Sequence, residues 1–310
     1  MLTRSLLRTK IAQVVYANTI AENTLQGFDN ELNYSLKKSY DLYHLLLLLP
    51  YELTFMAKRE LDINSGRLVK NNDIVSQLGK FACQTYSQRL FENMDLASYT
   101  KNNSLSWFNN YEDELVSIYK RLKATPFFME YAQSEETGFE VDRQLWKKFF
   151  RSKYIFNDEF EDFLEEQSIY LTDDLEVTIS FAGKTIARLP EFHSSEYRLL
   201  PMYKDEEEQK FVQKLAHSTV LKAMEYDAMI SEVASKWDIE RITRMDRVLL
   251  RMAIAEIKEF PLIPVTVTMN EYIEISKHYS TDKSHIFING ILDRISKTLI
   301  EKGLVKAGQD

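Results

Sequence analysis

The stretch that decides the fold of this chain is Pro264-Val-Thr-Val-Thr-Met-Asn-Glu-Tyr-Ile-Glu-Ile-Ser-Lys-His-Tyr279, followed directly by Ser280-Thr-Asp-Lys-Ser-His-Ile-Phe-Ile-Asn-Gly-Ile-Leu-Asp-Arg294. Apolar residues recur in both parts at the three- and four-residue spacing of an amphipathic helix. Pro264 suits a first helical turn, because the N–H that proline lacks has no partner there. We therefore predict two helices joined by a short polar turn, in which Thr281 or Asp282 caps the second helix.

A glycine inside the second predicted helix needs an explanation. Asn289-Gly290 ordinarily signals a turn. The apolar stripe nevertheless runs straight through this pair, from Phe287 and Ile288 to Ile291 and beyond. Glycine costs a helix ~1 kcal/mol relative to alanine. We predict that Gly290 is a small residue at a place where two helices approach closely.

A third helix is predicted upstream of these two. Thr243-Arg-Met-Asp246 resembles a capping box in which Asp replaces Glu or Gln. Apolar residues follow at helical spacing until Pro261 and Pro264 end the pattern. The predicted order is a capped helix, a break marked by prolines, an amphipathic helix, a polar turn and a second amphipathic helix.

Four segments of the chain carry a family resemblance. Three lie in this region: Asp246-Arg-Val-Leu-Leu-Arg-Met-Ala253, Ile263-Pro-Val-Thr-Val-Thr-Met-Asn-Glu271 and Ser284-His-Ile-Phe-Ile-Asn-Gly-Ile-Leu-Asp293. The fourth is the N-terminal Arg4-Ser-Leu-Leu-Arg-Thr-Lys-Ile-Ala-Gln-Val-Val-Tyr16. In this order and spacing they resemble the NusB family of bacterial transcription antitermination factors, in a long form.

The resemblance implies an all-α fold with a NusB-like two-bundle helical core. Residues 1–25 are expected to form the first helix with its Arg-rich RNA-binding end, and residues 201–310 the C-terminal part of the core. Residues 26–200 are then a helical insertion that extends or replaces the first bundle. The composition agrees with an all-α fold, because 8 glycines and 6 prolines are few for 310 residues.

The resemblance also implies a function without catalysis or cofactors. Members of the family bind boxA-type RNA in the nascent transcript together with NusE, which is also a small-subunit ribosomal protein. The pair suppresses termination by RNA polymerase, notably in ribosomal RNA operons, and reaches the elongation complex through other Nus factors. The competing hypothesis is a helical scaffold of the transcription or ribosome-assembly machinery that binds little RNA. RNA methyltransferases with a NusB-like N-terminal domain are a third class, which we reject because no dinucleotide-type fold follows the NusB-like part.

Residue by residue, the resemblance assigns two surfaces. The expected RNA-binding residues are Arg4, Arg8, Lys10, Lys283, Ser284, His285 and Phe287. The expected contacts to NusE are Tyr16, Glu240 and Asp246. The spacing supports part of the first set, because Arg4 and Arg8 lie four residues apart and share a helix face that suits phosphates. A solvated basic helix end is the alternative interpretation of the same pattern.

The composition limits the other possibilities. A net charge of −8 argues against a general nucleic-acid binder, so RNA binding must depend on a local patch. The single cysteine, Cys83, excludes an intrachain disulfide and fits a reducing cytoplasm, and we expect it to be a small buried residue. Charged residues interrupt the N-terminus, and the apolar run from Leu45 to Leu49 is too short to cross a membrane. No histidine has a partner at metal-ligand spacing, and no Gly-rich phosphate loop follows a strand.

Two features of the predicted insertion have open interpretations. Lys147-Lys-Phe-Phe-Arg-Ser-Lys-Tyr154 interleaves cations with aromatic rings, which suits single-stranded nucleic acid, but we favour an amphipathic helix with its rings in the core. Pro50 is expected to kink or break a helix over residues 26–60. A helix is expected to run to about Leu189, although Val177-Thr-Ile-Ser180 would also allow a strand.

Overall fold

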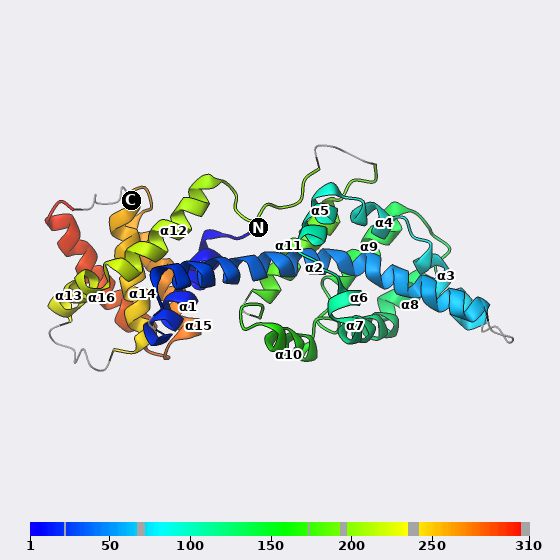
Figure 1. Ribbon diagram of the computed structural model, residues 1–310, viewed down its shortest axis with the longest axis horizontal. Coiled ribbons are helices and arrows are strands. Elements are labelled where there is room, and N and C mark those ends of the chain that lie inside the picture. Colours follow the sequence, from blue (N-terminus) through cyan, green and yellow to red (C-terminus); the bar gives the residue numbers. More distant parts are fainter. Residues whose placement is uncertain (22, 67–71, 173, 193–196, 235–241, 305–310) are drawn as a thin grey trace. The chain divides into compact units, whose positions relative to one another are not determined.

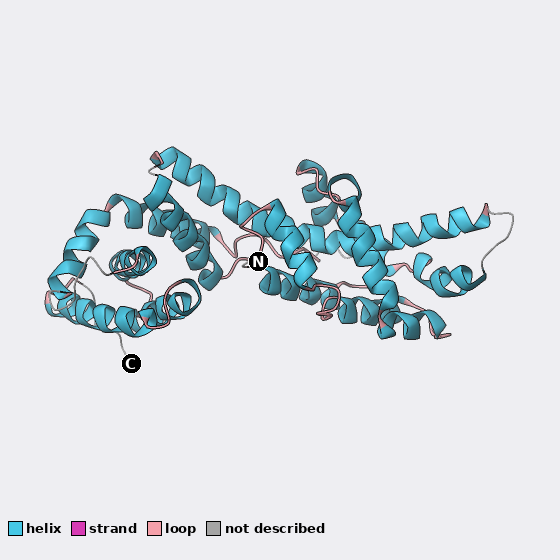
Figure 2. Cartoon of the chain, turned by 90° about the horizontal axis from the view of Figure 1, so that it is seen from below, coloured by secondary structure: helices cyan, strands magenta, loops and turns pink. Residues whose placement is uncertain are grey.

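The computed structural model describes residues 1–21, 23–66, 72–172, 174–192, 197–234 and 242–304. Within these ranges the chain is all-α and contains no strand (Figure 2). The contacts between residues divide the chain into two compact units. Unit 1 consists of Met1 and residues 37–202, and unit 2 consists of residues 2–36 and 203–310. The predicted all-α fold is therefore confirmed.

Unit 2 contains the N-terminal and C-terminal helices of the chain (Figure 1). Its helices are α1 (Arg4–Ala21), α12 (Glu206–Leu221), α13 (Ala223–Val233), α14 (Arg244–Glu259), α15 (Val265–Tyr279) and α16 (Ser284–Glu301). The long helix α2 (Leu25–Ser65) contributes its residues up to Leu36.

Helix α14 forms the centre of unit 2. The helices α1, α12, α13, α15 and α16 all pack against it (Figure 1). Its residues from Val248 to Ile257 are buried apart from Arg251, so the helix is enclosed on nearly every side. Its N-terminus is capped as predicted, because the hydroxyl of Thr243 accepts a hydrogen bond from the N–H of Asp246 at 3.0 Å.

Helices α15 and α16 confirm the predicted pair, with two corrections. No side chain caps α16, whose N-cap residue is Lys283, because the hydroxyl of Thr281 bonds to Ser284 at 2.8 Å instead. Gly290 is exposed, and no atom of the neighbouring described residues lies within 4 Å of the position of a Cβ. Gly290 therefore does not mark a close approach of two helices.

Unit 1 is built from the remaining helices and the greater part of α2. They are α3 (Asn72–Ala82), α4 (Tyr86–Phe91), α5 (Met94–Asn102), α6 (Trp107–Asn110), α7 (Glu112–Ala124), α8 (Pro126–Gln133), α9 (Phe139–Phe149), α10 (Asp158–Gln167) and α11 (Leu175–Arg188). The helical interpretation of Val177-Thr-Ile-Ser180 is confirmed, since these residues lie in α11.

Pro50 does not end α2, which continues to Ser65. Of the two expected effects of Pro50, a kink or a break, the break does not occur. Proline removes one intrahelical hydrogen bond, but the leucines on both sides are buried, from Leu45 to Leu49 and again at Leu53. Their burial in the core of unit 1 stabilises the helical conformation through this position.

The core of unit 1 is rich in aromatic rings. Trp107 and Trp146 are both fully buried. The indole nitrogen of Trp107 donates to the carbonyl oxygen of Leu45 at 2.7 Å, and that of Trp146 donates to Oε1 of Gln84 at 2.7 Å. Each large ring therefore keeps a hydrogen-bond partner inside the core, as buried tryptophans generally do.

The two units do not divide the chain at the residues that the sequence suggested. The sequence places the boundaries of the insertion at residues 26 and 200, whereas unit 1 runs from residue 37 to residue 202. The assignment of residues 26–200 as an insertion stays a prediction. In the described part of the chain, none of the helices combines the length and the apolar character that a membrane crossing requires.

Candidate RNA and partner interfaces

Arg8 of α1 is buried in unit 2 and is paired with Glu256 of α14. Its Nε donates to Oε2 of Glu256 at 2.8 Å and its Nη2 donates to Oε1 at 2.7 Å. A third nitrogen, Nη1, lies 3.3 Å from a carboxylate oxygen of Glu271. The side chain of Arg8 is 3% exposed and that of Glu256 is fully buried. This is the bidentate geometry in which a guanidinium binds a carboxylate most strongly.

Two further donors complete the site around Glu256. Thr268 donates to Oε1 at 2.8 Å and Tyr272 donates to Oε2 at 2.9 Å. Burial lowers the pKa of Arg8, but the hydrogen bonds and the charge of Glu256 raise that pKa above its ordinary value. Burial, followed by the charge of Glu256, raises the pKa of Tyr272 well above its usual range. Arg8 therefore stays charged and joins α1 to α14 and α15.

The three N-terminal cations lie in different surroundings. Arg4 is exposed, whereas Arg8 and Lys10 are buried. The shared face predicted for Arg4 and Arg8 is present, because both guanidiniums lie over the ring of Phe211, at 5.3 and 5.4 Å from its centroid. That face packs against the core of unit 2. Of the three cations Arg4, Arg8 and Lys10, only Arg4 is exposed on the surface. The burial of Arg8 reflects acidic partners far away in the sequence, Glu256 and Glu271.

Asp246 and Ser284 lie in a buried junction between three helix ends. Oγ of Ser280 donates to Oδ1 of Asp246 at 2.7 Å, and Oγ of Ser284 donates to Oδ2 at 3.0 Å. Asp246 is 4% exposed and Ser284 is 2% exposed. These side chains connect the N-terminus of α14 with the end of α15 and the start of α16. They position the surface around them, and little of either side chain is accessible to a ligand.

A groove on α16 contains the exposed part of the predicted RNA surface. It has a volume of about 370 Å³ and is lined by Lys283, Ile286, Phe287, Gly290, Ile291 and Arg294. Lys283 and Arg294 are exposed, and Phe287 is half-buried. No acidic residue lines the groove. His285 is half-buried and does not line it. Sequence reasoning missed Arg294, although its spacing from Lys283, Phe287 and Gly290 places all four on one helix face.

The groove and the Arg8 site lie near opposite ends of α14. Arg8 binds Glu256, whereas Ser284, next to Lys283, binds Asp246. Ten residues of helix separate these two acids, which corresponds to about 15 Å along the axis. Arg4 lies over the same ring of Phe211 as Arg8, so it also belongs to the Glu256 end of α14. The prediction that the N-terminal cations and the Lys283 region bind one ligand together stays a prediction, which this arrangement does not support.

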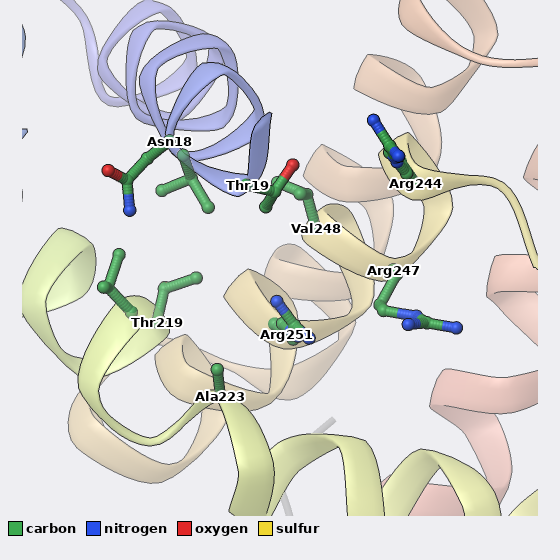
Figure 3. Close-up of a pocket in the computed structure, with 10 residues that line it drawn as sticks. Asn18, Thr19, Thr219, Ala223, Arg244, Arg247, Val248 and Arg251 are labelled. Atoms are coloured by element: carbon green, nitrogen blue, oxygen red, sulfur yellow. The ribbon is translucent and has the colours of Figure 1, made fainter. Parts of the chain in front are cut away.

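A second pocket of unit 2 lies between α1, α14 and the junction of α12 and α13 (Figure 3). It has a volume of about 360 Å³ and includes Asn18, Thr19 and three arginines of α14: Arg244, Arg247 and Arg251. Figure 3 shows Arg251 pointing into the space beneath α1, while Arg244 and Arg247 point outward. Arg251 is held by Asp227 through bonds of 2.7 and 2.5 Å. The sequence prediction did not include these arginines, whose spacing of three and four residues was the available signal.

The residues predicted to contact NusE differ in their position relative to this pocket. Tyr16 is half-buried and lies two residues before Asn18 on α1. Asp246 lies on α14 between Arg244 and Arg247, but its side chain is buried in the junction described above. Glu240 lies outside the described residues. The C-terminal half of α1 and the first turns of α14 thus form the surface closest to the predicted contacts.

The aromatic and basic segment around Phe149 belongs to the core of unit 1. Phe149 and Phe150 are buried, which confirms the core interpretation for these two rings, whereas Tyr154 is exposed and lies beyond the end of α9. Lys147, Arg151 and Lys153 line a cavity of about 780 Å³ together with Phe150 and Phe156. Four acidic residues line the same cavity: Asp158, Glu159, Glu161 and Glu176. The negative charges of these acids repel an anionic ligand such as RNA.

Two further expectations concern reactive groups. Cys83 is exposed, which corrects the expectation of a buried thiol. It follows the last residue of α3, Ala82. Among the described residues, no group of three His, Cys, Asp or Glu side chains is placed to hold a metal ion.

Comparisons with known proteins place part of the chain in one family. Residues 184–297, from α11 to α16, match the sequence model of the NusB family. The chain is 39% identical over 111 residues to the transcription antitermination protein NusB of Salinibacter ruber. This alignment covers 36% of this chain and 69% of the relative. The chain is also 34% identical over 137 residues to the protein of the same name from Geobacter sp. strain M21. That alignment covers 44% of this chain and 91% of the relative. No solved structure gave a significant match.

Proposed function

The chain belongs to the NusB family, and from this premise we propose that it is a non-enzymatic, RNA-binding antitermination factor. It pairs with NusE on boxA-type RNA and suppresses termination, notably in ribosomal RNA operons. It reaches RNA polymerase through other Nus factors and acts in the cytoplasm, where transcripts are made. The structural observation that carries the proposal is the acid-free groove on α16 between two exposed cations.

The groove supplies the chemistry that single-stranded RNA requires. Lys283 provides a cation for a phosphate, and the ring of Phe287 provides a surface on which a base stacks. His285 lies in the first turn of α16, where unpaired backbone N–H groups also favour anions. Arg4 adds an exposed cation on α1. Arg8, Lys10 and Ser284 support RNA binding from within the core by positioning α1 and α16.

The partner surface in this proposal is the arginine-lined pocket of unit 2. Tyr16 lies beside it on α1, and Asp246 fixes the first turn of α14, from which Arg244 and Arg247 extend. Among the described residues neither of these two arginines has an ion-pair partner. In this proposal both guanidiniums bind acidic groups of NusE. Glu240 completes the proposed contact set.

The experiment that tests the proposal is a titration of fluorescently labelled boxA-type RNA with the full chain, with and without NusE. We expect NusE to raise the affinity for boxA-type RNA. The logarithm of the affinity should fall linearly with the logarithm of salt concentration, by about 0.7 per phosphate contact on a single strand. Equal affinity for a scrambled RNA of the same length, with NusE present, would contradict the proposal.

A charge reversal tests the groove within this proposal. Lys283→Glu places a negative charge at the groove and should weaken RNA binding. Lys58→Glu, at an exposed position of α2 in unit 1, changes the net charge by the same amount and serves as the control. Unchanged affinity of the Lys283→Glu protein would exclude a role of Lys283 in RNA contact.

The second candidate function is a protein scaffold with little RNA binding of its own. The net charge of −8 and the additional helices of unit 1 favour it. A pulldown that recovers NusE, while RNA crosslinking stays at background, would support the scaffold and contradict the RNA-binding factor.

A further inference from the structure

The largest of the cavities described above lies in unit 1, between the end of α9, the start of α10 and one face of α11; we call it the α11 cavity. Its volume of about 780 Å³ exceeds those of the two pockets of unit 2, which are about 360 and 370 Å³. Nearly all of its lining precedes residue 184, where the match to the NusB family model begins. The role of this cavity therefore does not follow from the family.

The floor of the α11 cavity is apolar. The rings of Phe150 and Phe156 stack with their centroids 5.9 Å apart, and both side chains are buried. Leu175 and Ile179 of α11 line the same space, and Ile179 is half-buried. An apolar lining with polar groups around it is the usual character of a binding site.

Charged side chains of both signs surround this floor. Four basic and four acidic residues line the cavity. One of the acids, Glu159, pairs at 3.5 Å with Arg121, which does not line the cavity. Among the described residues, the other charged side chains of the lining have no ion-pair partner, although cations and acids line the same space. A ligand that carries both signs complements this lining, whereas a purely acidic or purely basic ligand meets repulsion.

The wall formed by α11 has opposite charges at its two ends. Glu176, Ser180 and Lys184 line the cavity at four-residue spacing and so lie in one row. Glu176 and Lys184 are both exposed. Eight residues of helix separate them, which corresponds to about 12 Å along the axis. About four residues of extended peptide span this distance. The two backbone charges of a single amino acid do not, because both groups are attached to the same Cα.

We propose that the α11 cavity binds a short segment of a partner protein, in which apolar side chains lie between a basic and an acidic one. The basic side chain of this segment binds Glu176 and its acidic side chain binds Lys184. The apolar side chains between them lie on Phe150, Phe156 and Ile179. The occupant is identified by charge complementarity and by the distance between the two charges of α11. The proposal goes beyond the function proposed above, because the groove on α16 and the arginine-lined pocket take no part in it.

A selection of random displayed peptides on the full chain tests the proposal. The library is first depleted on a double variant, Glu176→Lys with Lys184→Glu, which exchanges the two charges of α11. This step removes peptides that bind elsewhere on the protein. We expect the retained peptides to carry apolar residues between a basic and an acidic one. Retention of no peptide, or of peptides with charges of one sign only, would overturn the proposal.

The affinity of a retained peptide for the same double variant measures the contribution of the charges. The net charge of this variant equals that of the unmodified chain. We expect binding to weaken about ten-fold or more, because each charge of the peptide then faces a like charge. The matched control is Asp113→Lys with Lys120→Glu on α7. Both of these residues are exposed, Asp113 lies in a first helical turn as Glu176 does, and neither lines the cavity. The control should bind the peptide as tightly as the unmodified chain.

The variant Ile179→Asp tests the apolar floor and should also weaken binding of the peptide, because it places a charge where apolar side chains lie. Val177→Asp is the control on the same helix, since Val177 is 40% exposed and does not line the cavity. Thermal unfolding of both variants shows whether they remain folded. The exchange of charges on α11 tests the proposal independently of this result, because both of its positions are exposed.

A reciprocal exchange gives the decisive outcome. A retained peptide whose own basic and acidic residues are exchanged should bind the double variant of α11 more tightly than it binds the unmodified chain. Equal binding of the original and the exchanged peptide to both proteins would place them outside the cavity and overturn the proposal. Displacement of the bound peptide by single-stranded RNA would assign the cavity to RNA and would also overturn it. None of these measurements depends on whether the chain binds boxA-type RNA with NusE, so the two proposals fail separately.

Discussion

The cores of the two units are stabilised by different chemistry. Unit 2 buries an ion pair, Arg8 with Glu256, near its central helix. Unit 1 has a largely buried ion pair as well, Arg121 with Glu114, but two of its buried acids bind uncharged donors. Asp142 accepts a hydrogen bond from the hydroxyl of Tyr131 at 2.7 Å, and Glu52 accepts from the N–H of Trp107 at 2.9 Å. Burial raises the pKa of both acids.

This difference shows where each unit is vulnerable. The buried charge of Glu256 in unit 2 is tolerated only while its cation and its hydroxyl donors are present. The buried acids of unit 1 can take up a proton and become neutral, so the free-energy cost of burying them is limited. Unit 2 is therefore expected to depend strongly on one side chain, and unit 1 to depend on pH and on ring packing.

The largest effect is expected for Arg8→Met. It removes the cation and leaves Glu256 buried without it, which typically destabilises a protein by about 3–5 kcal/mol. Hydrogen exchange followed by mass spectrometry should show faster exchange in peptides of α1, α14 and α15, with peptides of unit 1 changed much less. Arg4→Met is the control on the same helix, because Arg4 is exposed. Equal exchange in the two variants would contradict a structural role for the pair.

A second change sharpens this prediction. Glu256→Gln in the Arg8→Met background removes the unpaired charge but keeps an oxygen that accepts from Thr268 and Tyr272. We expect it to recover part of the lost stability, because the cost lies mainly in the buried charge. A further loss of stability would show that the shape of the site matters more than its charge.

The next effect concerns pH and is confined to unit 1. His44 is 1% exposed, and burial lowers its pKa to about 4 from 6.5. Between these values the unfolded chain binds a proton that the folded chain does not, so stability falls as the pH decreases from about 6.5 to about 4. One group contributes about 1.4 kcal/mol per pH unit, which gives a loss of about 3 kcal/mol at pH 4.

The variant His44→Asn isolates this contribution. The amide nitrogen of Asn can replace Nδ1, which lies 2.9 Å from the carbonyl oxygen of Tyr40. Glu52 and Asp142, whose raised pKa values stabilise the folded chain as the pH falls, act equally in both proteins. We expect urea denaturation of the variant to depend less on pH in this window. The same pH dependence in both proteins would exclude His44 as its source.

A smaller effect is expected for Trp107→Phe in unit 1. The change removes the hydrogen bond to the carbonyl oxygen of Leu45 and part of a fully buried ring. The loss should be about 1–3 kcal/mol in the free energy of unfolding, measured by urea denaturation. Exchange in peptides of α14 should stay unchanged. Faster exchange in α14 would show that the two cores are not independent.

The smallest effect is expected at two glycines, one in each unit. Gly79→Ala and Gly290→Ala should each raise the free energy of unfolding by up to about 1 kcal/mol, because both positions are helical and open. Helix propensity does not depend on the chemistry of the core, so the two changes should be similar. Thermal unfolding checks this, and destabilisation by either variant would contradict the open surroundings of that glycine.

Local patterns in the sequence predicted the helices well. The cap at Thr243 was predicted from its capping residue. The helices α15 and α16 and the helical state of Val177-Thr-Ile-Ser180 follow from the spacing of apolar residues, although no side chain caps α11, α15 or α16. The expectation about Gly290 was wrong, and the break that was allowed at Pro50 does not occur. In both cases the deciding factor is the surroundings of the residue, which are apolar and buried at Pro50 and open at Gly290.

The candidate site was predicted less completely, because its residues depend on partners far away along the chain. Arg8 and Lys283 look alike in sequence, as cations near helix ends. Arg8 is buried because Glu256, 248 residues later, meets it in the fold. Arg294 was not predicted, since the groove that it lines exists only where α16 packs its opposite face into unit 2.

The amino-acid sequence by itself determined the all-α class, the order of the last three helices and the family resemblance, because periodicity, caps and motifs are local properties of the chain. Only the tertiary structure decided which cations are on the surface and which are structural. Burial and ion pairing depend on residues brought together from distant positions, and no local pattern contains that information.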